Sequence, residues 1–175
     1  MKDNKRLNLG CGRNIMEGYV NADMVRAEGV DVCCDFEEAL PFDDNTFCEI
    51  IVYHVLEHIK GFDNLINELW RISEPGAIIK VSVPYYRNKN AFSDPHHVRF
   101  FTENTFDYWI SGRKEGCSYM VNSPAEFDLE KVRLVFPRSI FTVIWHIIPV
   151  ESWHNLWGFI VSSIYYELRV KKQEE

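Results

Sequence analysis

The chain has 175 residues, which is enough for one domain with one core and too few for two catalytic domains. Hydrophobic residues make up 46% of it and charged residues 26%, a globular composition that excludes a disordered or collagen-like chain. The formal net charge is −7, so the chain lacks the broad basic surface that duplex nucleic acid requires. We therefore expect no nucleic-acid partner.

The cysteines and the first residues predict a cytoplasmic protein with reduced thiols. The chain has five cysteines, an odd number, and no Cys-x-x-Cys pair. The opening Met-Lys-Asp-Asn-Lys-Arg leads into no apolar signal segment. We therefore expect a cytoplasmic location and no zinc held by cysteines.

Short apolar runs separated by turn residues predict a parallel sheet in the first half of the chain. The predicted strands are Leu7–Leu9, Tyr19–Ala22, Val30–Cys34, Phe47–Tyr53 and Ala77–Val83. Apolar residues at helical spacing predict a helix over Asn64–Ile72, which the following Glu-Pro-Gly should end. Such alternation is typical of a parallel sheet with helices on its faces, where ligands bind at the carboxyl ends of the strands.

Three further segments complete the predicted domain, which spans residues 1–175. The first two strands are separated only by Cys11–Tyr19, close to the minimum for a parallel crossover, so the first helix should be a stub. A polar loop after residue 84 should lead into a helix that begins at Thr102. The last two predicted strands, Phe127–Pro137 and Ile164–Val170, are expected to pair antiparallel.

The first chemical signal is a strand that runs into a glycine turn, Leu7-Asn8-Leu9-Gly10-Cys11-Gly12. Missing side chains at such a turn let a ligand approach the backbone and meet free N–H groups. Asp23 ends the next strand, where a carboxylate can bind both hydroxyls of a ribose. The plain alternatives are a tight turn and a turn aspartate.

A second acidic residue marks the end of the third strand. Asp35 follows Val32-Cys33-Cys34 and precedes Phe36, so it should lie at the same sheet edge as Asp23. A carboxylate acceptor beside an aromatic ring suits an adenine, which offers an amino donor and a flat face. The alternative is a solvated loop acid.

Further segments follow in a recognisable order. They are Leu40-Pro41-Phe42-Asp43-Asp44-Asn45-Thr46-Phe47, His54-Val55-Leu56-Glu57-His58 and Leu69-Trp70-Arg71-Ile72-Ser73-Glu74-Pro75-Gly76. With the glycine turn and the two acids, this series resembles the class I S-adenosylmethionine-dependent methyltransferases, in particular the small methyltransferase-domain proteins of type 11. The resemblance covers residues 6–84. It implies a Rossmann-like α/β fold with a truncated first helix and a mostly parallel seven-stranded sheet whose last strand is antiparallel.

The resemblance also implies S-adenosylmethionine as the cofactor and a set of binding residues. The implied residues are Asn8, Gly10, Cys11, Gly12, Asp23, Asp35, Phe36, Tyr53 and His54. In that family the glycine turn faces the methionine part of the cofactor. By the same resemblance Asp23 would hold the ribose, Asp35 and Phe36 would hold the adenine, and the end of the fourth strand would close the site. Asn8 stands where the family usually has an acid, and Asn14 stands where it has a third glycine.

The segment His54–His58 also matches HxxEH, the inverted zinc-peptidase motif. In that motif two histidines one helical turn apart bind the metal, and the glutamate activates water. The motif requires both histidines on one helix, whereas Phe47–Tyr53 is predicted as a strand, with His54 at its end and His58 in the next turn. We therefore expect no metal site and keep a zinc hydrolase as the less favoured alternative.

The loop Ser93–Phe101 is the predicted substrate side, because it follows the fifth strand and contains groups that move protons or bind anions. Histidine is the best-suited general base near neutral pH, so His97 is the predicted base, with Asp94 orienting it. The remaining substrate-side candidates, among them a cation for an acidic group, are His58, His96 and Arg99. The alternative is a turn whose histidines cap the next helix.

An apolar, aromatic-rich segment over residues 139–162 is predicted as a helical insertion between the last two strands. His146, Pro149, Glu151 and His154 interrupt it, so it lacks the continuous apolar run of a membrane-spanning helix. It could pack in the core, form a homodimer face, cover the substrate or rest on a membrane surface with the help of nearby basic residues.

These observations predict an S-adenosylmethionine-dependent methyltransferase that acts on an oxygen or nitrogen of a small-molecule, sugar or lipid-linked substrate. The sulfonium already activates the methyl group, so the protein mainly has to align the acceptor and exclude water. The alternative of another class is a non-catalytic protein of the same fold that recruits a partner.

Overall fold

The structure is a computed structural model, and it describes residues 5–113, 123–136 and 161–172. Its strands are β1 (Lys5–Leu9), β2 (Val20–Asp23), β3 (Val32–Cys33), β4 (Phe47–Tyr53), β5 (Ser73–Pro84), β6 (Phe127–Val135) and β7 (Ser163–Val170). Its helices are the 3-10 turn η1 (Leu56–His58), α1 (Phe62–Ile72), α2 (Asn90–Ser93) and the 3-10 turn η2 (Asp107–Trp109).

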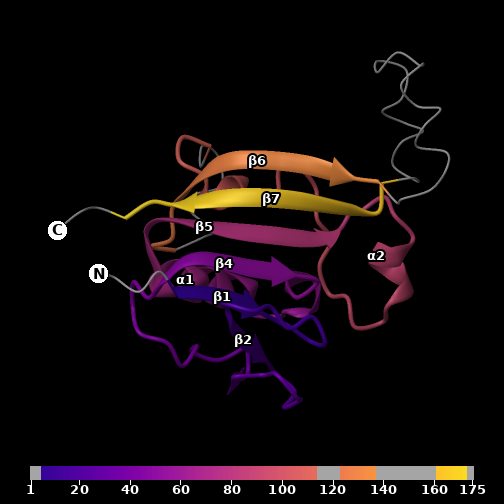
Figure 1. The fold of residues 1–175 in the computed structure, drawn as a ribbon. Coiled ribbons are helices and arrows are strands. Elements are labelled where there is room, and N and C mark those ends of the chain that lie inside the picture. The colour runs from indigo at the N-terminus through magenta and orange to yellow at the C-terminus, as the bar shows by residue number, and fades with distance from the viewer. Residues whose placement is uncertain (1–4, 114–122, 137–160, 173–175) are drawn as a thin grey trace.

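The seven strands form one sheet in the order β3-β2-β1-β4-β5-β7-β6 (Figure 1). Strands β1 to β5 pair in parallel, while β7 lies antiparallel to both β5 and β6. This arrangement confirms the predicted α/β class, the mostly parallel sheet and the antiparallel last strand.

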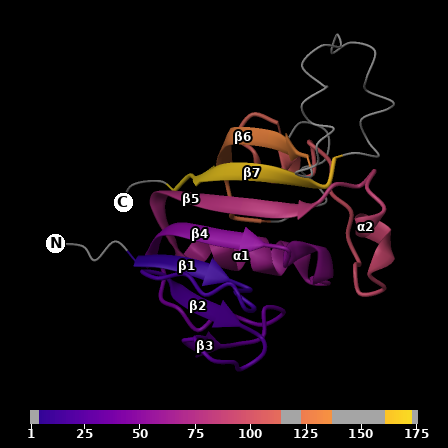
Figure 2. The same cartoon turned by 45° about the vertical axis from the view of Figure 1, so that its right-hand side comes forward.

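Helix α1 covers one face of the sheet (Figure 2). Its apolar residues recur at helical spacing, and Leu65, Ile66, Leu69 and Ile72 are all buried. They pack in one core with inward-facing strand residues such as Ile79. The long β-branched runs of β4 and β5 therefore form the centre of the sheet, as their sequence predicted.

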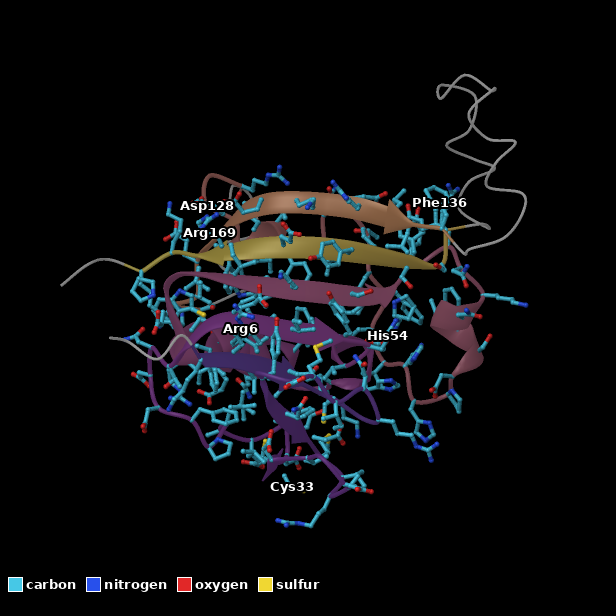
Figure 3. All side chains as sticks on the ribbon, in the orientation of Figure 1. Arg6, Cys33, His54, Asp128, Phe136 and Arg169 are labelled. Atoms are coloured by element: carbon cyan, nitrogen blue, oxygen red, sulfur yellow. The ribbon has the colours of Figure 1, made fainter. Side chains whose placement is uncertain are left out.

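The opposite face of the sheet carries no helix in the described residues, which differs from the expectation of helices on both faces. The connections from β1 to β4 are too short or too rich in turns to form one. Polar pairs cover this face instead, among them Lys80 with Glu49 at 2.5 Å and Lys131 with Glu167 at 3.1 Å. Figure 3 shows this face with its labelled side chain Arg6.

Two predicted helices are wrong. The stub expected between β1 and β2 is a series of turns, in which Gly10, Gly12 and Gly18 take positive φ values that interrupt a right-handed helix. The segment that begins at Thr102 is a turn, in which the N–H of Thr102 donates to Oγ1 of Thr105 at 2.8 Å. The 3-10 turn η2 follows it in place of the expected helix.

The predicted insertion over residues 139–162 lies almost wholly outside the described residues. Among the described residues, no helix has the length and the apolar character needed to cross a membrane. The described thiols Cys11, Cys33, Cys34 and Cys48 are free.

Candidate active site

The carboxyl ends of β1 to β4 meet at one edge of the sheet, and the predicted binding residues lie along it. Asp23 is the last residue of β2, and its pairing partner in β3 is Cys33. The N–H of Cys34 donates to the carbonyl of Asp23 at 3.1 Å, which places Asp35 one residue beyond this contact. The two acids therefore end adjacent strands, as the sequence analysis expected.

Gly10 begins the glycine turn at the end of β1 and cannot carry a side chain. Its φ is +72°, and a Cβ added to it would lie 2.1 Å from Cγ2 of Val55. The same Cβ would lie 3.7 Å from the ring of Phe36, which is buried in the core. Val55 and Phe36 thus support the turn from below. The ring of Phe36 is enclosed in the core, which differs from the expectation that it would offer a flat face to an adenine.

The N–H groups of the glycine turn are not free, in contrast to the expectation. Those of Gly10 and Cys11 both donate to the carbonyl of Ala22, at 2.8 and 3.1 Å. That of Gly12 donates to Oδ2 of Asp23 at 2.8 Å. The short connection to β2 folds the turn onto that strand, so β2 takes the donors that a full helix would leave pointing outward.

Open space and unused acceptors remain at this edge. A Cβ on Gly12 would meet no atom within 4 Å, so a ligand can approach its backbone. Asp23 accepts N–H groups from Gly12 and Val25, and Asp35 accepts one from Glu37. Each carboxylate oxygen has two lone pairs, so both acids retain acceptors for ligand hydroxyl or amino groups. These acceptors, together with the open space, fit the hydroxyl and amino groups of a nucleoside.

Asn8 is buried under the glycine turn and makes structural contacts. Its Nδ2 donates to the carbonyl of Asn14 at 2.8 Å and to Oδ1 of Asn21 at 2.9 Å. Oδ1 of Asn21 also accepts the N–H of Met16. These amides hold the connection between β1 and β2 against the sheet, so the two asparagines do the anchoring that a longer helix would otherwise provide.

Tyr53 is the last residue of β4, and His54, labelled in Figure 3, follows it at the same edge. Tyr53 is half-buried and makes an edge contact with Tyr165. His54 has a left-handed φ of +57°, and its Nδ1 lies 3.1 Å from Oε1 of Glu57. That hydrogen bond raises the pKa of His54, although burial opposes it. The backbone reversal at His54 therefore directs the chain into η1.

The loop that follows β5 brings Asp94, His96 and His97 beside η1, but their contacts differ from the expected ones. Oδ1 of Asp94 lies 3.0 Å from Nδ1 of His96, while its Oδ2 is 3.9 Å from Nε2 of His97. Nδ1 of His97 instead lies 3.0 Å from the carbonyl of Ala91. The side chain of His96 is 82% exposed and that of His97 only 9%. Asp94 thus orients His96, and Ala91 orients His97.

Arg99 is anchored to the backbone after η1. Its Nε donates to the carbonyl of Ile59 at 3.0 Å and its Nη2 to that of Lys60 at 2.7 Å. Its guanidinium also lies 4.9 Å from the ring centre of Phe62, a cation–π distance. Arg99 borders a small cavity of about 270 Å³ that is lined mainly by apolar residues. These contacts fix the loop, so much of the donor capacity of Arg99 is committed to the fold.

The structure also brings together Glu57, His58 and His97, a group that the sequence analysis did not predict. The motif His54–His58 contained two of the three residues. The third lies far away in the sequence, so no local spacing could have found it. His54 is not part of the group, and it lies at the end of β4 while His58 lies in η1, as expected.

Comparisons with known proteins find one matching family model and a set of similar solved structures. Residues 11–81 match the model of a methyltransferase domain family. No curated protein sequence matches the chain.

Several solved structures similar to the chain are described as methyltransferases. An S-adenosylmethionine-dependent methyltransferase from Archaeoglobus fulgidus is 18% identical with a TM-score of 0.65, over 97% of this chain and 87% of that one. A putative methyltransferase of Haloferax volcanii, solved with the activator Trm112, is 15% identical with a TM-score of 0.61, over 99% and 84%. A Haemonchus contortus N-methyltransferase, solved with phosphomonomethylethanolamine and S-adenosylhomocysteine, is 16% identical with a TM-score of 0.60, over 99% and 50%.

The likeness to these structures shows the fold, and the family model covers Cys11 and Gly12 of the glycine turn, both acids and β4. The strand order, the position of Asp23 and Asp35 at adjacent strand ends, and the family match agree with one another. Together they give the chain the fold of S-adenosylmethionine-dependent methyltransferases and relate residues 11–81 to a methyltransferase domain family.

Proposed function

We propose that this protein transfers the methyl group of S-adenosylmethionine to an oxygen or nitrogen atom of a small-molecule, sugar or lipid-linked acceptor. The observation that carries this proposal is the position of Asp23 and Asp35 at adjacent strand ends beside the glycine turn. Ligands of open parallel sheets bind at this edge, outside the carboxyl ends of the strands.

The side chains at the edge divide the work of binding. Asp23 binds the ribose hydroxyls and Asp35 binds the adenine amino group. The open space at Gly12 admits the methionine part of the cofactor, while Tyr53 and His54 border the site at the end of β4. When bound, the cofactor supplies a methyl group that its sulfonium already activates. The protein therefore has to hold the acceptor in line and exclude water.

His97 is the proposed proton acceptor, because its contacts define which nitrogen is available. Its Nδ1 faces the carbonyl of Ala91 and must carry the proton to donate there. Nε2 then keeps its lone pair and can take a proton from an acceptor hydroxyl or ammonium. His58, His96 and Arg99 surround this position as proposed substrate-side residues.

Ligand-induced stabilisation tests the cofactor site. S-adenosylhomocysteine at about 100 times its dissociation constant should add about 2.7 kcal/mol to the free energy of unfolding. For a chain of this size, that gain raises the Tm by roughly 5–10 °C. Asp23→Asn should remove most of this increase, because a hydrogen bond to a charged group contributes about 1.5–3 kcal/mol. Differential scanning fluorimetry with and without the ligand measures both effects.

Asp43→Asn is the matched control, because Asp43 is an exposed carboxylate that precedes β4 and so lies at the opposite edge of the sheet. It should keep the full ligand-induced increase in Tm. Equal responses in both variants would contradict the role of Asp23. A wild-type protein that responds to neither S-adenosylmethionine nor S-adenosylhomocysteine would instead favour the non-catalytic alternative, which the bound N–H groups of the glycine turn suggest.

Two of the similar structures supply candidates for the acceptor. The Haemonchus contortus neighbour was solved with a small phosphorylated amine, which is one acceptor of the proposed class. The Haloferax volcanii neighbour was solved with an activator protein, so a protein partner is a second candidate. Release of S-adenosylhomocysteine across a panel of amines, sugars and lipid-linked compounds, with and without added activator, would separate these candidates.

A further inference from the structure

We infer that Glu57, His58 and His97 form a binding site for one divalent transition-metal ion. Each residue offers one ligand atom, and the three atoms lie within 4.8 Å of one another. Two imidazoles and a carboxylate are a ligand set that zinc and similar ions prefer. The inference does not depend on the proposed function, because it concerns metal binding by the protein alone.

Glu57 provides the observation that points to a missing ligand. The residue is 1% exposed, and Oε1 is engaged by Nδ1 of His54 at 3.1 Å. Its other oxygen, Oε2, is buried and has no hydrogen-bond partner in residues 5–113, 123–136 and 161–172. A buried carboxylate oxygen without a partner is costly, and a cation coordinated there would remove that cost.

His97 presents a nitrogen that is prepared for coordination. Its Nδ1 is held by the carbonyl of Ala91, which leaves the lone pair on Nε2. A metal-binding histidine commonly donates its second N–H to a carbonyl or carboxylate, because this fixes the orientation and the tautomer of the ring. His97 therefore already has the outer contact that such a ligand requires.

His58 is the adjustable member of the group. Its ring centre is 4.7 Å from that of His97, and the residue is exposed. Coordination bonds of about 2.0–2.2 Å bring ligand atoms closer together than 4.8 Å, so one side chain has to rotate inward. An exposed imidazole can do this without moving the core, whereas Glu57 and His97 are held in place.

The backbone holds the two parts of the site together. The N–H of Val98 donates to the carbonyl of Glu57 at 2.8 Å. Arg99 binds the carbonyls of Ile59 and Lys60, as described above. The loop that carries His97 is therefore bound directly to the turn that carries Glu57 and His58. The backbone of the site is therefore organised before an ion binds, and only the exposed side chain of His58 has to adjust.

The ligand chemistry selects the ion and differs from the peptidase motif. Mg²⁺ and Ca²⁺ prefer oxygen ligands only, so two nitrogens out of three favour Zn²⁺ or a related ion. His54 contacts Glu57 and so acts as an outer partner, in place of the first ligand of the HxxEH motif. Three protein ligands leave a fourth position for water or an acceptor oxygen. The ion would occupy Nε2 of His97, so it and an acceptor proton compete for one atom.

Zinc titration of the chelator-treated full chain, without a histidine tag and without S-adenosylmethionine, tests the inference. We expect one Zn²⁺ per chain in competition with a chromophoric chelator, and visible absorption of tetrahedral Co²⁺ when cobalt replaces zinc. Absence of stoichiometric binding by the wild-type protein would overturn the inference, whatever the outcome of the cofactor experiments.

Variants locate the site. His58→Ala and His97→Ala should each weaken Zn²⁺ binding at least ~100-fold, since loss even of an outer partner costs about 10–100-fold. His96→Ala is the control, because it removes an exposed histidine of the same loop and should change the affinity by less than about twofold. Equal weakening in the control, or unchanged affinity in His58→Ala, would contradict the assignment. His58 is exposed, so this variant should fold, and its Tm verifies that.

Discussion

Single atoms decide the shape of the proposed cofactor site at the carboxyl ends of β1 to β4. Gly10 has to be glycine because the side chain of Val55 occupies the place of a Cβ, whereas Gly12 has open space in front of it. Both have positive φ values, so any other residue at either position would be conformationally strained. Only Gly10 also meets a collision with the core. Two glycines that look equivalent in the sequence therefore differ in what they do.

Alanine substitution should separate these two glycines. Gly10→Ala should destabilise the fold by about 3 kcal/mol, from about 1–2 kcal/mol of backbone strain and a similar cost of overpacking against Val55. Gly12→Ala should cost only about 1 kcal/mol, from strain alone. Urea unfolding followed by circular dichroism measures both values. Equal losses would show that contact with Val55 does not limit position 10.

At the scale of elements, one arginine connects α1 to the segment before β4. The guanidinium of Arg71 donates to the carbonyls of Leu40 and Phe42 and pairs with Glu68 and Asp44. Glu68 in turn accepts the N–H of Leu40 at 2.8 Å. The segment before β4 contains no helix, so these contacts hold it against the last turns of α1. A charge network here replaces the packing that an additional helix would provide.

Loss of this network should be measurable as a change in stability. Arg71→Met should lower the free energy of unfolding by about 2 kcal/mol, because it breaks several partly buried hydrogen bonds to charged groups and carbonyls. Arg113→Met is the matched control, since Arg113 forms one partly exposed ion pair with Asp107. Its loss should lower the free energy of unfolding by less than about 0.5 kcal/mol. Chemical denaturation of both variants provides the comparison. A loss in the control as large as that in Arg71→Met would refute this ranking.

The same network predicts a direction of pH dependence. Hydrogen bonds from Arg71 lower the pKa of Glu68 below its usual value of 4.5, although burial opposes them. A lowered native pKa contributes stability that is complete above the unfolded value and is lost as the pH falls through the native value. Stability should therefore decline below about pH 4.5. Glu68→Gln should show a shallower decline when unfolding is measured between pH 6 and pH 3, and an unchanged slope would contradict the assignment.

At the scale of the whole molecule, stability should be distributed unevenly across the sheet. Strand β5 pairs along its length with β4 on one side and β7 on the other, and α1 covers it. Strand β3 has two residues and forms one edge. Local opening is easiest where few apolar contacts and backbone bonds hold a segment. Strands β2 and β3, which carry the two acids of the proposed cofactor site, are therefore expected to be the least stable part of the described sheet.

Hydrogen exchange detected by mass spectrometry should reveal this order. Amides of β4, β5 and β7 should exchange slowest, and those of β2 and β3 fastest. Addition of S-adenosylhomocysteine should slow exchange at the glycine turn and at the ends of β2 and β3, because the ligand would connect them. Uniform protection throughout the sheet would contradict this distribution.

The sequence by itself determined the elements whose periodicity is local. The apolar runs predicted β4, α1 and β7 closely, and the order of motifs predicted the sheet edge where Asp23 and Asp35 meet. It could not determine which groups use their hydrogen bonds within the fold. Two predictions were wrong for this reason. The expected helix at Thr102 is replaced by a turn because Thr102 binds Thr105, and the N–H groups of the glycine turn are not free because they bind β2.

Only the tertiary structure decided how the predicted substrate-side loop is arranged. His97 lies beside Glu57 because Val98 and Arg99 bind the backbone around η1, a contact between segments distant in sequence. The spacing of residues within a short segment of sequence cannot predict such a contact. The bare polar face of the sheet was likewise decided by the turns that replace the expected helices. Periodicity therefore fixes the strands, while long-range packing fixes the partners of each polar group.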